Sequence, residues 1–466
     1  MIINPVTRIS GFMEIDADIE DNVVADARTE GLLFRGFENM LEGRSPFDAV
    51  YFTQRICGIC SSAHALASTM ALENAMSIAP SQQGRYLRDL IHGCEFLQNH
   101  IRHFYQYTAP DFIRLPESNA LFATDHNDFR LPKEKNDRIV QHYFDSLAYS
   151  RSAHEMLAIL GGKAPHNHGI FVGGVTAPAT PEKITRFRTL LLEIRAFICS
   201  KMIPDAYTIA DYYKEYFANG RGYGNFLTFG CFNAYHKLGT LYVDPVTNRD
   251  GKITPLNPGE ITETIYTSWY TAETETYTPY ETITQPELEK DDGYSWVKAP
   301  RYRGLPYEVG PLARMWLSGA YRHGISTMDR TIARVLEAKK ITDVMLTLVN
   351  NLIPCVSMQK KYQIPESGRG AGLVDTTRGA LGHWVKIENK VISLYQIITP
   401  SGWNLSTRSR DLLPGPGEKA MIGTTVINPD LPVELGRIIR SFDPCVSCAT
   451  HVYSKGNLIR TMQVVP

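Results

Sequence analysis

The sequence predicts an α+β protein that is predominantly helical, with a central bundle of long helices and peripheral β segments. From Gln83 to Ala109, apolar residues recur at steps of three and four, the spacing of one buried helix face. Those residues are Leu87, Leu90, Cys94, Leu97, Ile101 and Phe104. Comparable patterns run through 138–160, 182–217 and 326–352. Four long helices with facing apolar stripes favour a buried bundle at the centre.

The β segments are expected at the start of the chain and in one later stretch. Residues 12–19 alternate apolar and acidic side chains, residues 20–22 can form a turn, and residues 23–27 can return as a partner strand. The segment 261–284 is rich in Thr and Tyr and is predicted to be an extended loop or strand over the surface. We find no internal repeat and no convincing linker, so we expect one interwoven catalytic domain over residues 1–466.

Composition excludes several classes of protein. The 466 residues are 43% hydrophobic, so the chain can bury a large core. Lys plus Arg total 48 against 49 Asp plus Glu, with a pI near 6.9. The chain therefore lacks the excess of positive charge that favours binding to nucleic acid or to an anionic membrane surface. No apolar run is long enough to span a membrane, and the start MIINPVTRIS lacks the regions of a secretory signal. We expect no nucleic-acid partner and no transmembrane segment.

Four of the eight cysteines form two Cys-x-x-Cys pairs, Cys57 with Cys60 and Cys445 with Cys448. Two such turns supply four thiolates, the ligand set of structural zinc or of a redox metal centre. Cysteine spacing alone cannot decide between structural zinc, a redox metal centre and thiols that bind no common metal. Structural zinc sites, however, usually stabilise short chains that lack a hydrophobic core. A chain of this length has little need for such a site.

The neighbours of the pairs favour redox chemistry. His64 follows Cys60 by one helical turn, where its imidazole could donate a hydrogen bond to a metal-bound sulfur. Asp443 precedes the second pair and His451 follows it. A carboxylate beside soft thiolates is costly unless it pairs with a cation. This arrangement suggests proton movement close to a metal.

The motifs around both pairs closely resemble those of the nickel–iron hydrogenase large subunit: RICGIC at 55–60 and DPCVSCATH at 443–451. The likeness covers nearly the whole chain. Further similar segments are NPVTRI at 4–9, LFRGFE at 33–38, GGKAPHNHGIFVGGV at 161–175, YSWVKAPRY at 294–302, EVGPLAR at 308–314, RGALGHW at 378–384 and WN at 403–404. The resemblance implies the fold of that large subunit, and reversible heterolytic cleavage of dihydrogen as the activity.

The resemblance also implies a ligand set. Cys57 and Cys445 would be terminal thiolates on nickel, and Cys60 and Cys448 would bridge nickel to an iron that carries carbon monoxide and cyanide. Soft thiolates suit both metals. Glu38, in RGFE, would bind a magnesium or iron ion together with His451.

The catalytic residues implied by the resemblance lie around that centre. Arg378 matches an arginine over the nickel, and Asp111 and Asp443 match the carboxylates that hold it. Because a guanidinium is effectively always charged, we prefer the Cys445 thiolate as the base, with Arg378 orienting the incoming molecule. His64 is expected to tune the sulfurs.

Two positions depart from the family pattern. Relatives usually carry a glutamate, the first stop for protons leaving the terminal cysteine, where this chain has Ser10. A serine can pass a proton but cannot hold one as a carboxylate does. We hypothesise another carboxylate route, through Glu14, Glu30 or the side of Arg378 and Asp111. Thr377 stands where a proline usually precedes the arginine, which is expected to loosen the cover of the pocket.

Partners are implied for electrons and for maturation. The other four cysteines are scattered, so iron–sulfur clusters are expected only in a partner small subunit, with flavin/NAD or ferredoxin subunits beyond it. We expect a cytoplasmic complex, with export or membrane association alongside the small subunit as the alternative. Residues 452–466 resemble an extension that a maturation protease removes. A hydrogen-sensing regulator and a zinc-stapled scaffold subunit of a redox complex are the alternative functions.

Overall fold

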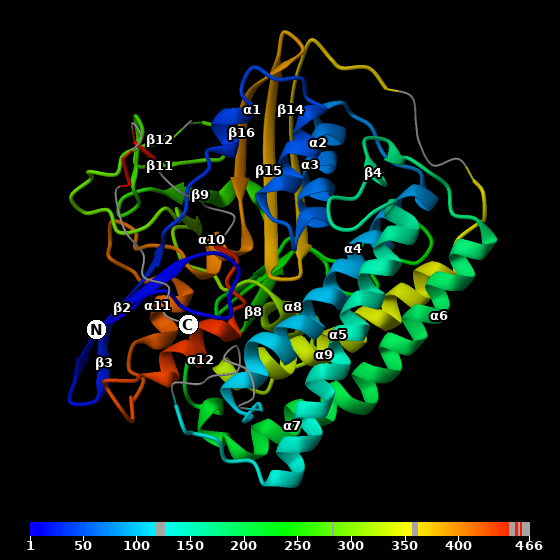
Figure 1. Cartoon of the computed structure of the whole chain (residues 1–466). Helices are drawn as coiled ribbons and strands as arrows, with labels where there is room; N and C mark the ends of the chain where they lie inside the picture. The colour runs from blue at the N-terminus through cyan, green and yellow to red at the C-terminus, as the bar shows by residue number, and fades with distance from the viewer. Residues whose placement is uncertain (117–125, 282–283, 357–361, 447–452, 455–456, 459–466) are drawn as a thin grey trace.

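The computed structural model describes residues 1–116, 126–281, 284–356, 362–446, 453–454 and 457–458 (Figure 1). Its α-helices are α1 (Phe37–Leu41), α2 (Asp48–Thr53), α3 (Ser61–Ala75), α4 (Gln82–Arg102), α5 (Lys133–Gly161), α6 (Pro181–Phe197), α7 (Ile203–Tyr212), α8 (Pro311–Leu317), α9 (Thr327–Asn350), α10 (Pro400–Asn404), α11 (Pro416–Met421) and α12 (Val433–Ser441). Its longer strands are β2 (Met13–Glu20), β3 (Val23–Gly31), β14 (Ser367–Thr376), β15 (Gly379–Glu388) and β16 (Val391–Ile398). Short strands complete the set: β1 (Ile2–Ile3), β4 (Ile170–Phe171), β5 (Gly174–Val175), β6 (Phe226–Thr228), β7 (Val246–Arg249), β8 (Lys252–Pro255), β9 (Ile261–Thr264), β10 (Tyr270–Thr271), β11 (Thr276–Tyr277), β12 (Gln285–Pro286), β13 (Ala299–Tyr302), β17 (Tyr453–Ser454) and β18 (Asn457–Leu458).

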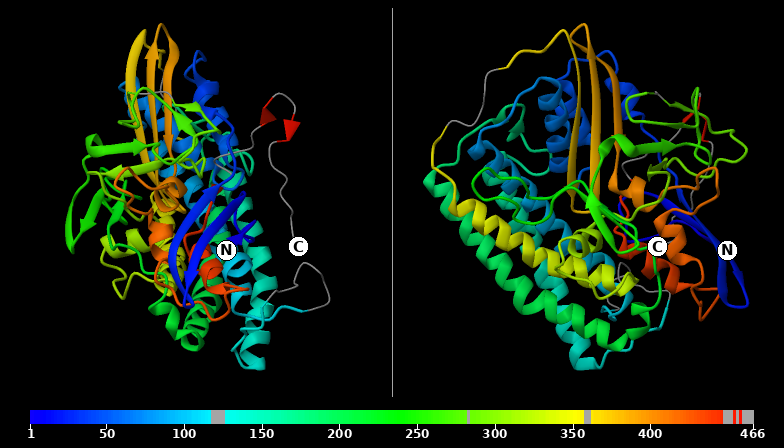
Figure 2. Two further views of the ribbon diagram at one scale, coloured as in Figure 1. Left: turned by 90° about the vertical axis from the view of Figure 1, so that its left-hand side faces the viewer. Right: turned by 180° about the vertical axis from the view of Figure 1, so that it is seen from behind.

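Four long helices, α4, α5, α6 and α9, lie side by side along one flank of the molecule (Figures 1 and 2). Their apolar faces form the largest hydrophobic cluster of the protein. Local sequence fixes where they begin: the Ser81 hydroxyl caps α4 by accepting from the Gly84 amide at 3.0 Å, and Ser326 and Asp329 form a capping box on α9. The predicted helix bundle is confirmed.

A three-stranded antiparallel sheet, ordered β14-β15-β16, packs against α3 (Figure 1). The approach is close because β14 carries glycines at alternate positions on the face toward α3. A Cβ on Gly368 would lie 2.8 Å from the Ala75 carbonyl oxygen. A Cβ on Gly372 would overlap the carbonyl oxygen of Ala67. Glycine here lets a helix and a strand touch through their backbones, which fixes the position of α3.

The predicted N-terminal hairpin is also confirmed, because β2 and β3 pair antiparallel, with β1 on the outer side of β2. Residues 261–284 contain β9, β10 and β11, as the extended prediction requires. The sheet β14-β15-β16 was not predicted. That residues 1–466 form one interwoven domain stays a prediction.

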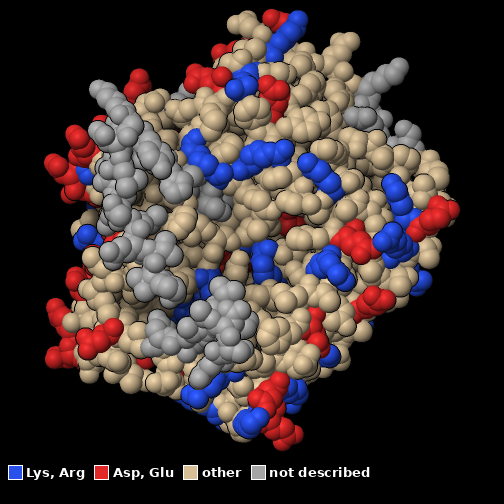
Figure 3. Space-filling model, viewed as in Figure 1, with Lys and Arg blue, Asp and Glu red and all other residues tan. Residues whose placement is uncertain are grey.

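Both signs of charge are distributed over the face shown in Figure 3, in keeping with the balanced composition. Within the described ranges, none of the helices combines the length and the apolar character that crossing a bilayer requires.

Candidate metal centre

Three cysteine sulfurs meet in the interior, next to the N-terminal end of α3. The Sγ atoms of Cys57, Cys60 and Cys445 all lie within 4.8 Å of one another, and those of Cys57 and Cys445 are 3.4 Å apart. All three residues are buried. In the described part of the chain, this is the one cluster of three or more side chains able to share a metal ion. The fourth predicted ligand, Cys448, lies outside the described residues.

Each of the three cysteines is positioned by the end of a short element. Cys57 follows the 3-10 turn Gln54–Ile56, and Cys60 is the N-cap of α3. Cys445 lies beyond α12, and its amide donates to the Ser401 hydroxyl at 2.9 Å. The chain just before Cys445 pairs with the N-terminal segment, where the Ser10 amide donates to the Pro444 carbonyl at 3.1 Å. Segments from both ends of the sequence therefore form this site.

The donor set fits a soft or borderline metal. Cys57 and Cys445 do not form a disulfide, because their sulfurs are 3.4 Å apart, well beyond the length of an S–S bond. Thiolate sulfur suits nickel and iron, whereas magnesium and calcium prefer oxygen. A small cavity beside the sulfurs is lined by Cys60, His64, Arg378, Ser401 and Cys445, so a metal bound there would face a charged guanidinium.

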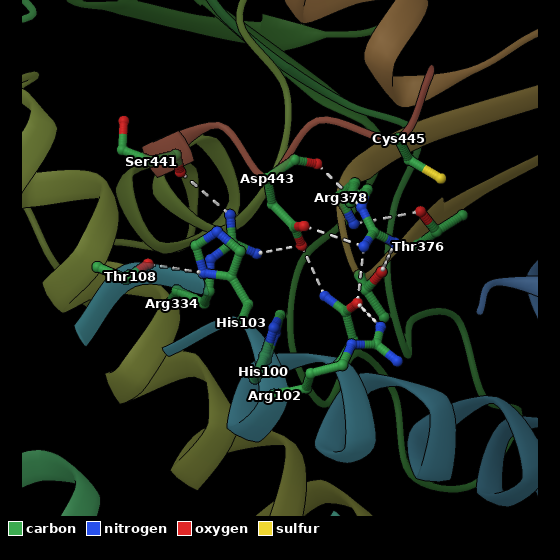
Figure 4. A network of polar contacts seen from close by, with 12 residues as sticks. His100, Arg102, His103, Thr108, Arg334, Thr376, Arg378, Ser441, Asp443 and Cys445 are labelled. Carbon is green, nitrogen blue, oxygen red and sulfur yellow. Dashed lines mark hydrogen bonds and ion pairs between the residues drawn. The ribbon is translucent and has the colours of Figure 1, made fainter. Parts of the chain in front are cut away.

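Arg378 lies in the turn between β14 and β15 and reaches across to the segment that carries Cys445 (Figure 4). Its Nε donates to the Asp443 carbonyl oxygen at 2.9 Å, and its Nη2 donates to the carboxylate of Asp443 at 2.9 Å and to Asn99 Oδ1 at 2.8 Å. Burial alone would lower the pKa of Arg378, but Asp443 and the three cysteines outweigh burial and hold it well above its usual value. Arg378 therefore keeps its charge.

Asp443 is the counter-ion of Arg378, as predicted. It also accepts from Asn99 Nδ2 at 2.7 Å and lies 3.3 Å from Arg334 Nη1. Burial alone would raise the pKa of Asp443, but Arg378, His103 and Arg334 outweigh burial and hold it well below its usual range. The carboxylate is thus permanently ionised at any physiological pH.

Asp111 does not hold Arg378, which corrects the sequence-based assignment. Its carboxylate pairs with Arg440, at 2.7 and 2.8 Å, and with Arg8 at 2.6 Å. Asn99 takes the position at Arg378 that was assigned to Asp111. The reason is local charge, because Arg8, Arg437 and Arg440 surround Asp111 and satisfy it.

His64 lies beside the sulfurs on the first turn of α3, where it was expected. Its Nδ1 is 3.1 Å from His383 Nε2, and His383 Nδ1 is 2.8 Å from the Tyr395 hydroxyl. Burial lowers the pKa of His64 to about 4, against a smaller raising effect of Cys445. The ring is neutral near pH 7, and a hydrogen bond from it to a sulfur would have to use Nε2.

A second pocket, lined in part by Cys445, contains Glu38. Glu38 Oε1 accepts from the Ile397 amide at 2.9 Å, and Oε2 is 2.9 Å from Lys298 Nζ. Lys298 is also 3.9 Å from Glu263. The described residues thus offer two carboxylates to a cation, with an ammonium already between them. The other expected ligand, His451, lies outside the described residues.

Thr377, one of the two positions that depart from the family pattern, lies in the turn between β14 and β15. The carbonyl of Thr377 accepts from Arg314 Nη2 at 3.3 Å, so the cover of the pocket is tied to a buried arginine. Glu14 and Glu30 face each other across β2 and β3. Their role in proton movement stays a prediction.

Sequence reasoning missed Asn99 and His383 as members of the site. Asn99 lies on a helix that the sequence predicted, but an uncharged amide gives no signal of its own. His383 lies in RGALGHW, one of the segments that carry the family resemblance. The family resemblance of that segment was the one sequence feature that could have indicated His383.

Comparisons with known proteins agree with this geometry. A family model described as nickel-dependent hydrogenase matches residues 35–121 and 116–451. The chain is 34% identical to the periplasmic [NiFeSe] hydrogenase large subunit of Desulfomicrobium baculatum, over 97% of this chain and 94% of that protein. It is 31% identical to the hydrogenase-2 large chain of Escherichia coli K12, over 99% of both chains. The reduced Ni-Fe-Se hydrogenase of D. vulgaris Hildenborough superposes with a TM-score of 0.93 at 36% identity, covering 97% of this chain and 99% of that one.

The first of these relatives corrects one expectation. A cytoplasmic location was predicted because Ser10, in place of the usual glutamate, sets the chain apart from the hydrogen-uptake enzymes it otherwise resembles. That prediction is wrong, since a relative similar over nearly the whole chain is periplasmic, which points to export. The error came from treating the substitution at Ser10 as evidence of location.

A cluster of buried thiols beside a charged arginine, on a fold shared along almost its full length with hydrogenase large subunits, leaves one family. This chain belongs to the nickel-dependent hydrogenases, as a large catalytic subunit and an oxidoreductase that acts on dihydrogen.

Proposed function

We propose that this subunit cleaves dihydrogen reversibly and heterolytically at a nickel–iron centre held by Cys57, Cys60, Cys445 and Cys448. The observation that carries the proposal is the buried cluster of three sulfurs that faces Arg378. When bound, the metal pair would supply the position at which dihydrogen is polarised. In this proposal Cys57 and Cys445 would hold the nickel, Cys60 and Cys448 would be shared between nickel and iron, and the iron would carry carbon monoxide and cyanide.

The side chains around the cavity have separate roles in this proposal. Arg378 cannot serve as the base because its charge is fixed, so it orients the incoming molecule and stabilises negative charge. The Cys445 thiolate is the preferred proton acceptor, because it lines the same cavity as Arg378. Ala63, Leu381 and Pro400 form an apolar part of the cavity wall, which helps to exclude water.

The electrons are proposed to leave through a small subunit that carries iron–sulfur clusters. The relatives are named large subunits or large chains, which implies a smaller partner. Among the described residues, Cys94, Cys199, Cys231 and Cys355 form no further ligand cluster. Onward transfer to a flavin/NAD or ferredoxin subunit was expected of a cytoplasmic complex, so it is not part of this proposal. Because the Desulfomicrobium relative is periplasmic, we propose that the complex is exported together with that partner.

Two further parts of the proposal concern the end of the chain. Glu38 and His451 would bind a magnesium or iron ion, and a maturation protease would remove residues 452–466 after nickel is loaded. Mass spectrometry of the active complex tests the second point. A chain that ends at His451 would support processing, and a full-length active chain would contradict it.

The metal centre is tested by elemental analysis and infrared spectroscopy of the purified complex. Nickel and iron, together with carbon monoxide and cyanide bands, are the expected result. Cys445→Ser should lose nickel, whereas Cys231→Ser, which alters a buried cysteine outside the cluster, should keep it. A matured sample without those bands would contradict the proposal. Zinc in place of nickel would revive the zinc-stapled scaffold that cysteine spacing alone left open.

A further inference from the structure

Glu95 is a buried carboxylate that the proposed mechanism leaves unused. It lies on α4, is 4% exposed, and points at the first turn of α3. Its Oε2 accepts from the Ser62 amide at 2.7 Å and its Oε1 from the Ala63 amide at 3.2 Å. The N-cap of α3 is Cys60, which provides no side-chain cap. Glu95 therefore binds the helix end that carries one of the clustered cysteines.

The Ser62 hydroxyl forms a second link to Glu95. It accepts from Asn167 Nδ2 at 3.2 Å, which leaves its own hydrogen to donate to the Glu95 carboxylate. Asn167 belongs to the loop 162–169, in which Gly162, Lys163 and His168 are exposed. Glu95 thus lies between the cysteine end of α3 and a loop that reaches the surface.

Glu95 differs from the ion-paired carboxylates beside the site in its ability to change charge. Burial raises the pKa of Glu95 to about 7, although the Ser62 and Ala63 amides and the charge of Arg378 favour the ionised form. Arg378 has the largest charge effect on it but is not in direct contact. Asp443, in contrast, is ion-paired and has a pKa well below the usual range. A group that holds and releases protons near neutral pH works best with a pKa near that pH.

The other polar groups near the cysteines are less suited to hold a proton. Arg378 keeps its charge, and the low pKa of His64 leaves that ring neutral. Ser10 has only a hydroxyl, which passes a proton but does not retain it. Glu263 also has a pKa raised to about 7 by burial, but it lies in the other pocket with Lys298.

We propose that Glu95 is the proton-holding group of this site, receiving protons released from dihydrogen and passing them toward the loop 162–169. The inference rests on the proposed function. Each dihydrogen yields two protons and two electrons. The electrons leave through the partner subunit, and Glu95 takes one proton at a time, changing from carboxylate to carboxylic acid and back. It stays redox-silent and acts through Ser62, so it is a relay and positioning residue.

The competing explanation is that Glu95 only caps α3. Glu95→Gln separates the two roles, because the amide oxygen can still accept from the helix but cannot take up a proton. Glu95→Asp keeps the acid on a shorter side chain. Glu418→Gln is the matched control, since burial also raises the pKa of Glu418 to about 7 but its partners are Thr29, Tyr294, Gly415 and Arg408.

The experiment uses the matured complex and measures nickel content, exchange of deuterium between D₂ and water, and the infrared carbonyl band of protonated carboxyl groups. With nickel content unchanged, Glu95→Gln should lose roughly 100-fold or more of the exchange rate, as loss of a general acid–base group does. Glu95→Asp should recover part of it with a shifted pH profile, and Glu418→Gln should match the wild type. Glu95, Glu263 and Glu418 should each contribute a carboxyl band that disappears as pH rises through about 7, and Glu95→Gln should lose one of these bands, in metal-free protein as well.

Wild-type exchange in nickel-loaded Glu95→Gln would overturn the inference. So would the absence of a titrating band that depends on Glu95, or loss of nickel in both Glu95 variants, which would make Glu95 a structural cap. If only Glu95→Gln loses nickel, an unshifted pH profile in Glu95→Asp overturns the inference and a shifted one supports it. Failure of the proposed function looks different, since the wild-type complex would then lack nickel or dihydrogen exchange while the carboxyl band still titrated.

Discussion

Arg378 contacts Asp443 twice, through Nε to the backbone carbonyl oxygen and through Nη2 to the carboxylate, each at 2.9 Å. Asp443 is two residues before Cys445, so the guanidinium fixes both the side chain and the backbone of the segment that presents this sulfur. One arginine therefore sets the charge of the site and the position of one of the clustered sulfurs together.

Replacing Arg378 with Lys should lower hydrogen oxidation by roughly 10²–10³-fold, because an ammonium keeps the charge but cannot form both contacts with one planar group. Dye-coupled turnover, corrected for nickel content, measures the effect. Arg322→Lys is the control, since Arg322 is exposed and donates only to the Trp316 carbonyl oxygen. Unchanged turnover in Arg378→Lys would exclude Arg378 from the mechanism.

Asp443→Asn should destabilise the protein by about 3–5 kcal/mol, because it leaves Arg378 and Arg334 buried without their counter-ion. Since the folded pKa of Asp443 is depressed, its contribution is present above the unfolded carboxyl pKa of about 4 and is lost as pH falls below it. Thermal unfolding at neutral and acidic pH measures both effects. Asp430→Asn changes an exposed carboxylate and should unfold like the wild type at both pH values. An equal loss in the two variants would disprove the assignment.

Gly372→Val should displace α3 and reduce metal loading. The added side chain would collide with the backbone of α3 at Ala67, at an estimated cost of about 1–3 kcal/mol or more. Nickel content and the unfolding temperature report the effect. At Gly259 a Cβ would have its nearest contact at 3.4 Å, so Gly259→Ala should be tolerated. Full nickel content in Gly372→Val would show that the contact with β14 does not position the cysteine.

Lys298→Met should make stability depend on a divalent cation. Lys298 neutralises Glu38 and Glu263, so its removal leaves the buried Glu263 and the half-buried Glu38 in mutual repulsion, at a cost of about 3–5 kcal/mol. Added magnesium should then restore much of the lost unfolding temperature, whereas it should do little for Lys252→Met, which changes an exposed lysine. No response to magnesium in Lys298→Met would argue against a cation at Glu38.

Glu418→Gln should flatten the pH dependence of stability. Because burial raises the folded pKa of Glu418 from 4.5 to about 7, the folded state binds more protons than the unfolded state in that window. Stability should therefore fall as pH rises from about 4.5 to 7, by up to roughly 3 kcal/mol from this residue. Thermal unfolding across that range in the wild type and in Glu418→Gln tests it. Parallel curves would contradict the assignment.

The sequence predicted those parts of the fold that depend on local periodicity. The long helix containing Leu87 and Ile101 follows from apolar spacing, and the hairpin that starts at Met13 follows from alternation. The sheet containing β14 escaped prediction, because its glycines exist to admit α3, and a glycine gives no hydrophobic pattern.

The site was predictable as far as its cysteines and its central ion pair. Cys57, Cys445, Arg378 and Asp443 meet as expected. Asp111 was assigned to the wrong arginine, since several buried arginines compete for a few carboxylates and only three-dimensional packing decides which pair.

The clustered sulfurs of Cys57 and Cys445 are separated by 388 positions along the chain. A ribosome must therefore add 388 residues after Cys57 before both sulfurs can reach one metal, so during that time the first Cys-x-x-Cys pair is only half of the proposed binding site. Any cell that makes this protein has to protect that pair from the wrong metal until Cys445 has been synthesised.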